Sequence, residues 1–306
     1  MGIGAYIREI GRGKEGARPL DRAQAADLFG QVLDGGLSDL EVGAFCLAMR
    51  IKGETAQEMA GFLDATHQRL NKVHNGQAPT VVLPSYNGAR KLPVLTPLLA
   101  LLLAREGLSV VVHGMASEST RVSAQNVLLD LGIRAEEAIE KIAPGTVQFI
   151  PTTLLCPGLA RLLDVRRVVG LRNSAHSLVK LMNPCNSPAI VVGSYTHPEY
   201  AASMAATFHL TGANALLLRG TEGEPVADPR RTPAMDAYLS GEVSRVQEAQ
   251  GGSLLTVPGL PAPDAPSTAA WIKAVLSGTE PTPQPIALQV AHIVQLAKTM
   301  SKSNTP

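Results

Sequence analysis

The sequence contains few of the residues that build metal centres, disulfide frameworks or base-stacking platforms. Aromatic residues make up 4% of the 306 residues, with a single tryptophan, which argues against binding of nucleobases by stacking. The three cysteines, Cys46, Cys156 and Cys185, lie far apart and lack metal-ligand spacing. We therefore expect neither a disulfide framework nor a zinc site, and no cofactor or metal of any kind.

A large net charge and a long apolar run are also missing. The formal net charge is +1, so the whole molecule does not strongly attract a polyanion, although a local patch can do so. The longest apolar stretch, Val94 to Ala104, contains Thr96 and Pro97 and is too short to span a bilayer. The first residues lack the apolar core of a secretion signal. We expect a cytoplasmic protein with no membrane partner.

Hydrophobic residues make up 45% of the chain and charged residues 17%, as is ordinary for a packed globular protein. Three helix starts in the first seventy residues carry side chains that accept hydrogen bonds from free backbone amides. These pairs are Asp21 with Gln24, Ser38 with Glu41, and Thr55 with Glu58. We expect residues 1–75 to form a small N-terminal helical domain.

After residue 75 the pattern changes to short apolar runs that alternate with helices, which is typical of a mostly parallel sheet. The expected strands are Thr80–Leu83, Leu108–Val112, Val147–Ile150, Ala189–Gly193, Ala215–Leu218 and Val243–Glu248. The expected helices are Leu95–Arg105, Arg121–Leu131, two pieces within Leu154–Met182, Pro198–Leu210, and two more containing Trp271 and Val290. The predicted fold class is α/β, with residues 76–306 forming a larger domain around a mostly parallel central sheet flanked by helices.

Ligands of open parallel sheets bind beyond the carboxyl ends of the strands, so the loops after the strands are informative. The loop after the first strand, Pro84 to Arg90, has one glycine and no acidic residue, which makes it a poor phosphate cradle. The loop that follows Arg219 contains Glu222 and Glu224. We expect these glutamates to be solvated, since their spacing specifies no metal site.

The order of several motifs resembles the superfamily of anthranilate phosphoribosyltransferase and pyrimidine nucleoside phosphorylase, glycosyltransferase family 3. The motifs are AFCLAMRIKGETAQEMAGF, VVHG, VGLRNSAHSLVKLMNP, SYTHPEY and LLLRGTEGE. Enzymes of that superfamily bind phosphoribosyl pyrophosphate or phosphate through a GTGGD loop, a KHGNR segment with following serines, and an Asp-Glu pair that holds magnesium.

The chain departs from that superfamily at all three motifs. The GTGGD position is SYNGAR, KHGNR is replaced by VHGMA, and the Asp-Glu pair falls on Pro225 and Val226. The resemblance therefore implies a degenerate substrate pocket without a metal. Its residues are Ser85, Asn87, Gly88, His113, Gly114, Ser117 and Ser119.

SYNGAR together with RGTEGE is similar to the YbiB-type branch of the superfamily. That branch is implied to be homodimeric, to bind nucleic acid and to lack transferase activity. We therefore expect a homodimer formed through the helical domain, with DNA or RNA as its partner.

A basic segment supplies residues for such binding. Between Arg161 and Lys180 the chain has five basic residues and one acidic residue, Asp164, a net charge of +4. Basic side chains neutralise phosphates and release counterions, which favours binding without sequence preference. The predicted nucleic-acid-binding residues are Arg161, Arg166, Arg167, Arg172 and Lys180, extended by Arg90 and Lys91.

The geometry of this segment leaves a second interpretation open. On one continuous helix Arg161 and Arg172 share a face while Arg166 and Arg167 point elsewhere, unless Gly170 ends the helix. The alternative to a nucleic-acid site is a solvated basic helix face paired with nearby glutamates.

Two other functions stay open. One is an active pentosyltransferase with altered substrate recognition, in which Ser85, Asn87, His113 and Arg172 surround a phosphorylated ligand. The other is a scaffold for protein interactions. His113, His176 and His197 have no nucleophile or acid partner nearby in the sequence, and we expect them to be structural.

Overall fold

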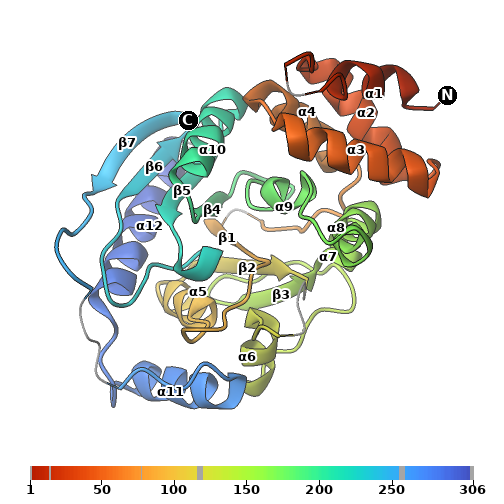
Figure 1. Ribbon diagram of the computed structural model, residues 1–306. Helices are drawn as coiled ribbons and strands as arrows, with labels where there is room; N and C mark the ends of the chain where they lie inside the picture. Colours follow the sequence, from red (N-terminus) through yellow and green to blue (C-terminus); the bar gives the residue numbers. More distant parts are fainter. Residues whose placement is uncertain (1, 14, 77, 116–119, 255–258, 304–306) are drawn as a thin grey trace.

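The computed structural model describes residues 2–13, 15–76, 78–115, 120–254 and 259–303. The first four helices of the described residues form a bundle, seen in red to orange in Figure 1. They are α1 (Gly4–Ile10), α2 (Arg22–Asp34), α3 (Asp39–Lys52) and α4 (Ala56–His67). The capping boxes predicted at Asp21, Ser38 and Thr55 are confirmed. Helix α1 was not predicted, and its start has no side-chain cap.

Three phenylalanines form the centre of the bundle. Phe29, Phe45 and Phe62 come from α2, α3 and α4 and are fully buried. The rings of Phe29 and Phe62 stack with centroids 4.5 Å apart, and Phe45 meets both edge-on. Stacked and edge-on aromatic pairs stabilise a core beyond the area that they bury.

The larger domain is built on a mixed, mostly parallel sheet, which confirms the predicted fold class. The described residues give seven strands in the order β3-β2-β1-β4-β5-β6-β7. Strands β1 to β5 pair in parallel, and β6 and β7 are antiparallel additions at one edge. Their bounds are β1 Thr80–Ser85, β2 Ser109–Gly114, β3 Val147–Pro151, β4 Ile190–Tyr195, β5 Asn214–Arg219, β6 Met235–Leu239 and β7 Glu242–Gln247.

Strand β6 was not predicted, although a local signal was present. Its sequence, MDAYL, has one acidic residue and lies in a segment rich in glycine and proline. The connection to β7 is Ser240-Gly241, and both residues have positive φ, 50° and 85°. Such two-residue turns match the twist of a β-hairpin. The Ser-Gly pair beside the predicted strand at Val243–Glu248 therefore indicated a hairpin.

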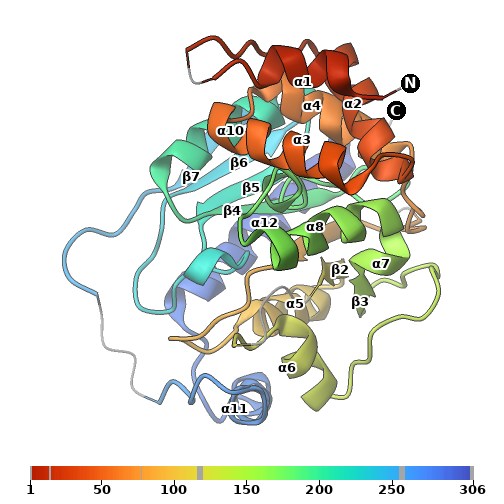
Figure 2. The ribbon, with the colours of Figure 1, turned by 45° about the vertical axis from the view of Figure 1, so that its right-hand side comes forward.

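Helices cover both faces of the sheet (Figures 1 and 2). On one face Val82 and Val111 belong to the same core as the bundle, and on the other Val81 and Val110 pack with α5, α11 and α12. Alternate residues of a strand point to opposite faces, so the central strands are buried on both sides. The helices are α5 Thr96–Arg105, α6 Ala124–Asp130, α7 Thr152–Leu155, α8 Pro157–Val169, α9 Ala175–Leu178, α10 Pro198–Thr211, α11 Ala265–Ser277 and α12 Gln284–Ser303.

The bundle packs on the larger domain through a few helices, and this packing positions the site. Helix α2 contacts α8, and α4 contacts α9 and α10. Where two pieces were predicted within Leu154–Met182, the structure has α8, α9 and the last two residues of α7. Among the described helices, none combines the length and the apolar character that a membrane span requires.

Candidate nucleic-acid interface and the loops beside it

A cleft of about 540 Å³ lies between the helical bundle and the larger domain. The bundle contributes Arg50 and the turn that follows α3. The segment around α9 and the loops after β1 and β4 contribute the other walls. These loops meet because β1 and β4 are neighbouring parallel strands whose carboxyl ends lie at the same edge of the sheet. Residues that line the cleft include Arg50, Glu54, Asn87, Arg172, Asn173, His176, Lys180, Tyr195, His197, Glu199 and Tyr200.

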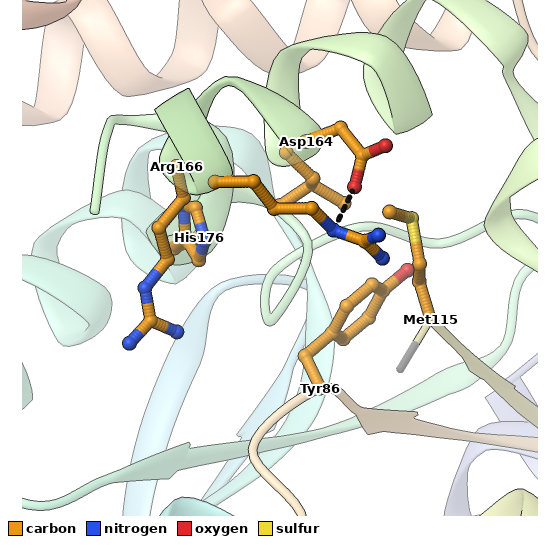
Figure 3. Close-up of a pocket in the computed structure, with 7 residues that line it drawn as sticks. Tyr86, Met115, Asp164, Arg166 and His176 are labelled. Atoms are coloured by element: carbon orange, nitrogen blue, oxygen red, sulfur yellow. Dashed lines mark ion pairs between the residues drawn. The ribbon is translucent and has the colours of Figure 1, made fainter. Parts of the chain in front are cut away.

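Positive charge is concentrated around His176, which lies between this cleft and a smaller hollow. Arg166, Arg167, Tyr86 and Met115 line the hollow with His176, and Figure 3 shows Arg166 beside the imidazole. Burial and the charges of Arg172, Arg166 and Arg50 lower the pKa of His176 to about 4. His176 is therefore neutral at pH 7, with three guanidinium groups near it.

We call Arg50, Arg166 and Arg172 the arginine cluster. The sequence predicted Arg166 and Arg172 as members of a basic site, and the structure brings them together. It did not predict Arg50, which belongs to α3 and is separated from Arg166 by more than a hundred residues. The local pattern around Arg50 is that of an ordinary helix C-terminus, where basic residues are common.

The end of α8 explains how Arg166 and Arg172 reach the same place. Gly170 has φ of 75° and ends the helix, and its N–H donates to the carbonyl of Arg166. A left-handed residue of this kind turns the chain away from the helix axis. Helix α8 thus ends at Gly170, a possibility that the sequence left open, and Arg172 lies beyond it in the loop before α9.

Two predicted binding residues donate hydrogen bonds to backbone carbonyls within the protein, and their assignment as phosphate ligands stays a prediction. Arg161 donates a guanidinium hydrogen bond to the carbonyl of Leu33, 2.9 Å away. Lys180 is 9% exposed, and its ammonium group donates to the carbonyls of Ser194 and Gly223. Burial lowers the pKa of Lys180 to about 8. Lys180 lines the cleft and contributes its positive charge to the wall.

The side chains of Arg167, Arg90 and Lys91 are exposed. Arg167 pairs with Asp164 at 2.9 Å, the ion pair drawn as a dashed line in Figure 3. Arg90 and Lys91 lie in the loop after β1. Exposed pairs of this kind contribute little to stability.

The loop after β1 holds a buried carboxylate. Glu224 is 1% exposed and accepts hydrogen bonds from the hydroxyls of Ser85 and Thr96, at 2.5 and 2.9 Å. It also accepts from the backbone amides of Asn87 and Gly88, at 2.9 and 2.8 Å. All of these donors lie more than a hundred residues before Glu224 in the sequence.

Glu222 contacts the next part of the same loop. Its carboxylate accepts from the backbone amides of Arg90, Lys91 and Leu92, at 3.2, 2.8 and 3.0 Å, and pairs with Arg121 at 3.6 Å. The prediction that Glu222 and Glu224 are solvated was therefore wrong. The loop does form a cradle of amides, and the protein's own carboxylates occupy it.

Of the predicted degenerate pocket, Asn87 lines the cleft. Ser85 and Gly88 face Glu224, and His113 is buried with its Nδ1 2.7 Å from the Tyr86 hydroxyl. Burial lowers the pKa of His113 to about 3. A Cβ on Gly114 would overlap the carbonyl oxygen of Ser85, so Gly114 serves strand packing. Ser117 and Ser119 lie outside the described residues.

The magnesium that the superfamily would imply does not fit the residues present. Pro225 and Val226 stand where the resemblance places the metal-binding Asp-Glu pair, and their side chains carry no oxygen. Within the described ranges no group of three or more His, Cys, Asp or Glu side chains could hold a metal ion. The nearest carboxylates, Glu222 and Glu224, already accept hydrogen bonds from the loop after β1.

Comparison with known proteins agrees with this architecture. Residues 5–69 match the helical bundle domain of the glycosyl transferase family. The crystal structure of anthranilate phosphoribosyltransferase (TrpD) from Thermus thermophilus has a TM-score of 0.75 and 21% identity, and the match covers 97% of this chain and 89% of that one. At this identity the likeness shows the fold.

Two sequence relatives are similar to this chain. Anthranilate phosphoribosyltransferase from Anaeromyxobacter dehalogenans (strain 2CP-C) is 31% identical over 184 residues, which cover 58% of this chain and 54% of the enzyme. The uncharacterized protein YbiB from Escherichia coli (strain K12) is 41% identical over 296 residues, 93% of this chain and 91% of YbiB. The chain therefore belongs to the family of YbiB, within the superfamily of anthranilate phosphoribosyltransferase and glycosyltransferase family 3.

Proposed function

We propose that this protein binds DNA or RNA without sequence preference, as a homodimer, on a scaffold that has lost pentosyl transfer. The observation that carries the proposal is the arginine cluster. Arg50 from α3 and Arg172 from the loop after α8 line the cleft, Arg166 from the end of α8 lines the neighbouring hollow, and all three lie near one neutral imidazole. In a chain of net charge +1, such convergence provides a local site for a polyanion.

Guanidinium groups suit phosphate because their planar fork of N–H donors matches two phosphate oxygens. The exposed side chains of Arg167, Arg90 and Lys91 supply further contacts with the phosphate backbone. Two acids, Glu54 and Glu199, line the same cleft, and the Ser174 hydroxyl donates to Glu54 at 2.5 Å. The strand should therefore follow the arginine side of the cleft.

Exposed apolar residues on α3 support the homodimer. Leu40, Leu47 and Ile51 are 83%, 46% and 60% exposed. Their spacing of seven and four residues places them on one face of the helix. Figure 2 shows α3 on the outer side of the bundle. A second copy presenting the same face would cover these side chains in a two-fold interface.

Binding to labelled duplex DNA across a salt series tests the proposal. About four phosphate contacts per site predict a slope of roughly −4 in log affinity against log salt concentration, because each contact releases counterions. Duplexes of unrelated sequence should bind with the same affinity. A slope near zero, or affinity for one sequence alone, would overturn the electrostatic account.

The second candidate is an active pentosyltransferase, and the size of the cleft favours it. About 540 Å³ suits a small ligand, and Asn87 and Arg172 line it. Ser85 and His113, the other residues assigned to this activity, are instead engaged in internal hydrogen bonds. Calorimetry with phosphoribosyl pyrophosphate and magnesium tests it: saturable binding at micromolar concentration would support a transferase, and none would favour loss of the activity.

A further inference from the structure

The amide cradle after β1 has the chemistry of an anion site. Five backbone amides, those of Asn87, Gly88, Arg90, Lys91 and Leu92, donate to two carboxylates, and the hydroxyls of Ser85 and Thr96 add two more donors. Successive N–H groups that point into one concavity bind anions. In this protein the bound anions are the carboxylates of Glu222 and Glu224, which belong to the same chain.

The segment that carries the carboxylates is held in an uncommon backbone conformation. Glu222 has φ of 50°, in the left-handed region that side chains other than glycine rarely adopt. Gly223 follows with φ of 87°, and a Cβ there would overlap Nδ2 of Asn87. Such conformations persist where the surroundings fix them. At Glu222, the hydrogen bonds from the amides of the cradle fix the backbone conformation.

The same segment is fixed from its other side. The carbonyl of Gly223 accepts from the Lys180 ammonium group and from the Ser194 hydroxyl, both at 2.8 Å. The Asn87 side chain donates to the carbonyl of Glu222 at 2.9 Å. The segment Glu222–Glu224 is therefore fixed between the cradle and the wall of the cleft, so its carboxylates stay in place.

We propose that Glu222 and Glu224 are built-in replacements for a bound oxyanion, and that they keep a functional anion cradle closed to free phosphate. Removing the carboxylates should open a site for a small tetrahedral oxyanion, for which inorganic phosphate is the probe. The donors that now serve the carboxylates would serve the phosphate oxygens. This inference does not depend on nucleic-acid binding, since the arginine cluster takes no part in it.

Glu222→Gly is the most informative variant, because glycine accepts the positive φ of this position without strain. If the carboxylate contributed nothing to stability, the substitution would leave the melting temperature unchanged or raise it. We expect it to fall, and inorganic phosphate at constant ionic strength to restore it. Sodium chloride should not restore the melting temperature. A matched control is Glu137→Ala, which removes an exposed acid that lines neither the cleft nor the cradle.

Calorimetry then measures phosphate binding directly. The double variant Glu222→Gly/Glu224→Gln should bind phosphate at least about tenfold more tightly than the wild-type protein and Glu137→Ala do. An unchanged or raised melting temperature in Glu222→Gly, or recovery by chloride as complete as that by phosphate, overturns the proposal. If the double variant does not fold, Glu222→Gly alone decides it. Duplex binding is measured separately, so failure of one proposal leaves the other standing.

Discussion

At the scale of single residues, the protonation of His176 reports on the arginine cluster. Burial and the charges of Arg172, Arg166 and Arg50 hold the pKa of this imidazole at about 4. An anion beside the cluster would offset those charges and leave burial as the remaining cause of the low pKa. A phosphate beside Arg172 should therefore raise the pKa of His176, which makes it a probe of where nucleic acid lies.

The lowered pKa also predicts a dependence of stability on pH. The unfolded chain, with an ordinary histidine pKa near 6.5, binds more protons than the folded chain between pH 4 and 6.5. The free energy of unfolding should thus fall as the pH falls through this window, by about 2–3 kcal/mol for His176 after allowance for solvent screening. Urea denaturation of wild type and His176→Gln measures the difference. Two pH profiles of identical slope would contradict it, because the contribution of His113 is common to both proteins.

Gly223 gives a second prediction at this scale. Its φ of 87° strains any residue other than glycine, and a Cβ at this position would overlap the side chain of Asn87. Gly223→Ala should lower the free energy of unfolding by about 2–4 kcal/mol, through backbone strain and the displaced side chain. Thermal denaturation followed by circular dichroism tests it. Gly36→Ala is the control, since a Cβ there meets nothing within 4 Å. Equal effects of the two substitutions would refute the close approach.

At the scale of elements, the proposed interface depends on where helices end. Helix α3 brings Arg50 to the cleft at its last turn, and α8 ends at Gly170 so that Arg172 leaves the helix axis. Neither helix alone has a basic face directed at the cleft. The cluster is produced by the junction of the bundle with the α8–α9 segment.

Replacing the arginine cluster, Arg50, Arg166 and Arg172, with alanine should weaken duplex binding at least about tenfold, equally on all sequences. The salt slope should become shallower by about one for each phosphate that the variant no longer neutralises. Fluorescence anisotropy across a salt series measures both. The triple variant Arg8, Arg105 and Arg134 to alanine makes the same change in net charge at exposed positions on other elements. If this control loses as much affinity, net charge rather than the cluster governs binding.

At the scale of the whole molecule, the apolar face of α3 decides the oligomeric state that we propose. A dimer through this face would present two arginine clusters to one nucleic acid. Leu47→Asp/Ile51→Asp should give a folded monomer, because a charge cannot be buried unpaired in an apolar interface. Sedimentation velocity measures the mass. Leu129→Asp changes an equally exposed leucine on α6 and should stay dimeric. A wild-type monomer would refute the interface.

Much of the fold could be predicted because its signals are local. The capping boxes at Asp21, Ser38 and Thr55 use residues three positions apart, and the parallel strands are runs of buried apolar residues. Gly170 ends α8 through its own backbone conformation. Strand β6 was missed because it is short, contains an acidic residue and lies in a segment rich in glycine and proline.

The amino-acid sequence by itself determined the two-part α/β fold, the family and the absence of carboxylates at Pro225 and Val226, since each of these depends on residue types in a fixed local order. Only the tertiary structure decided that Glu222 and Glu224 occupy the cradle and that Arg50 joins Arg166 and Arg172. The partners in these contacts lie more than a hundred residues apart. No periodicity in the sequence encodes which backbone amide a carboxylate contacts. The packing of neighbouring strands and helices decides which of these residues come together.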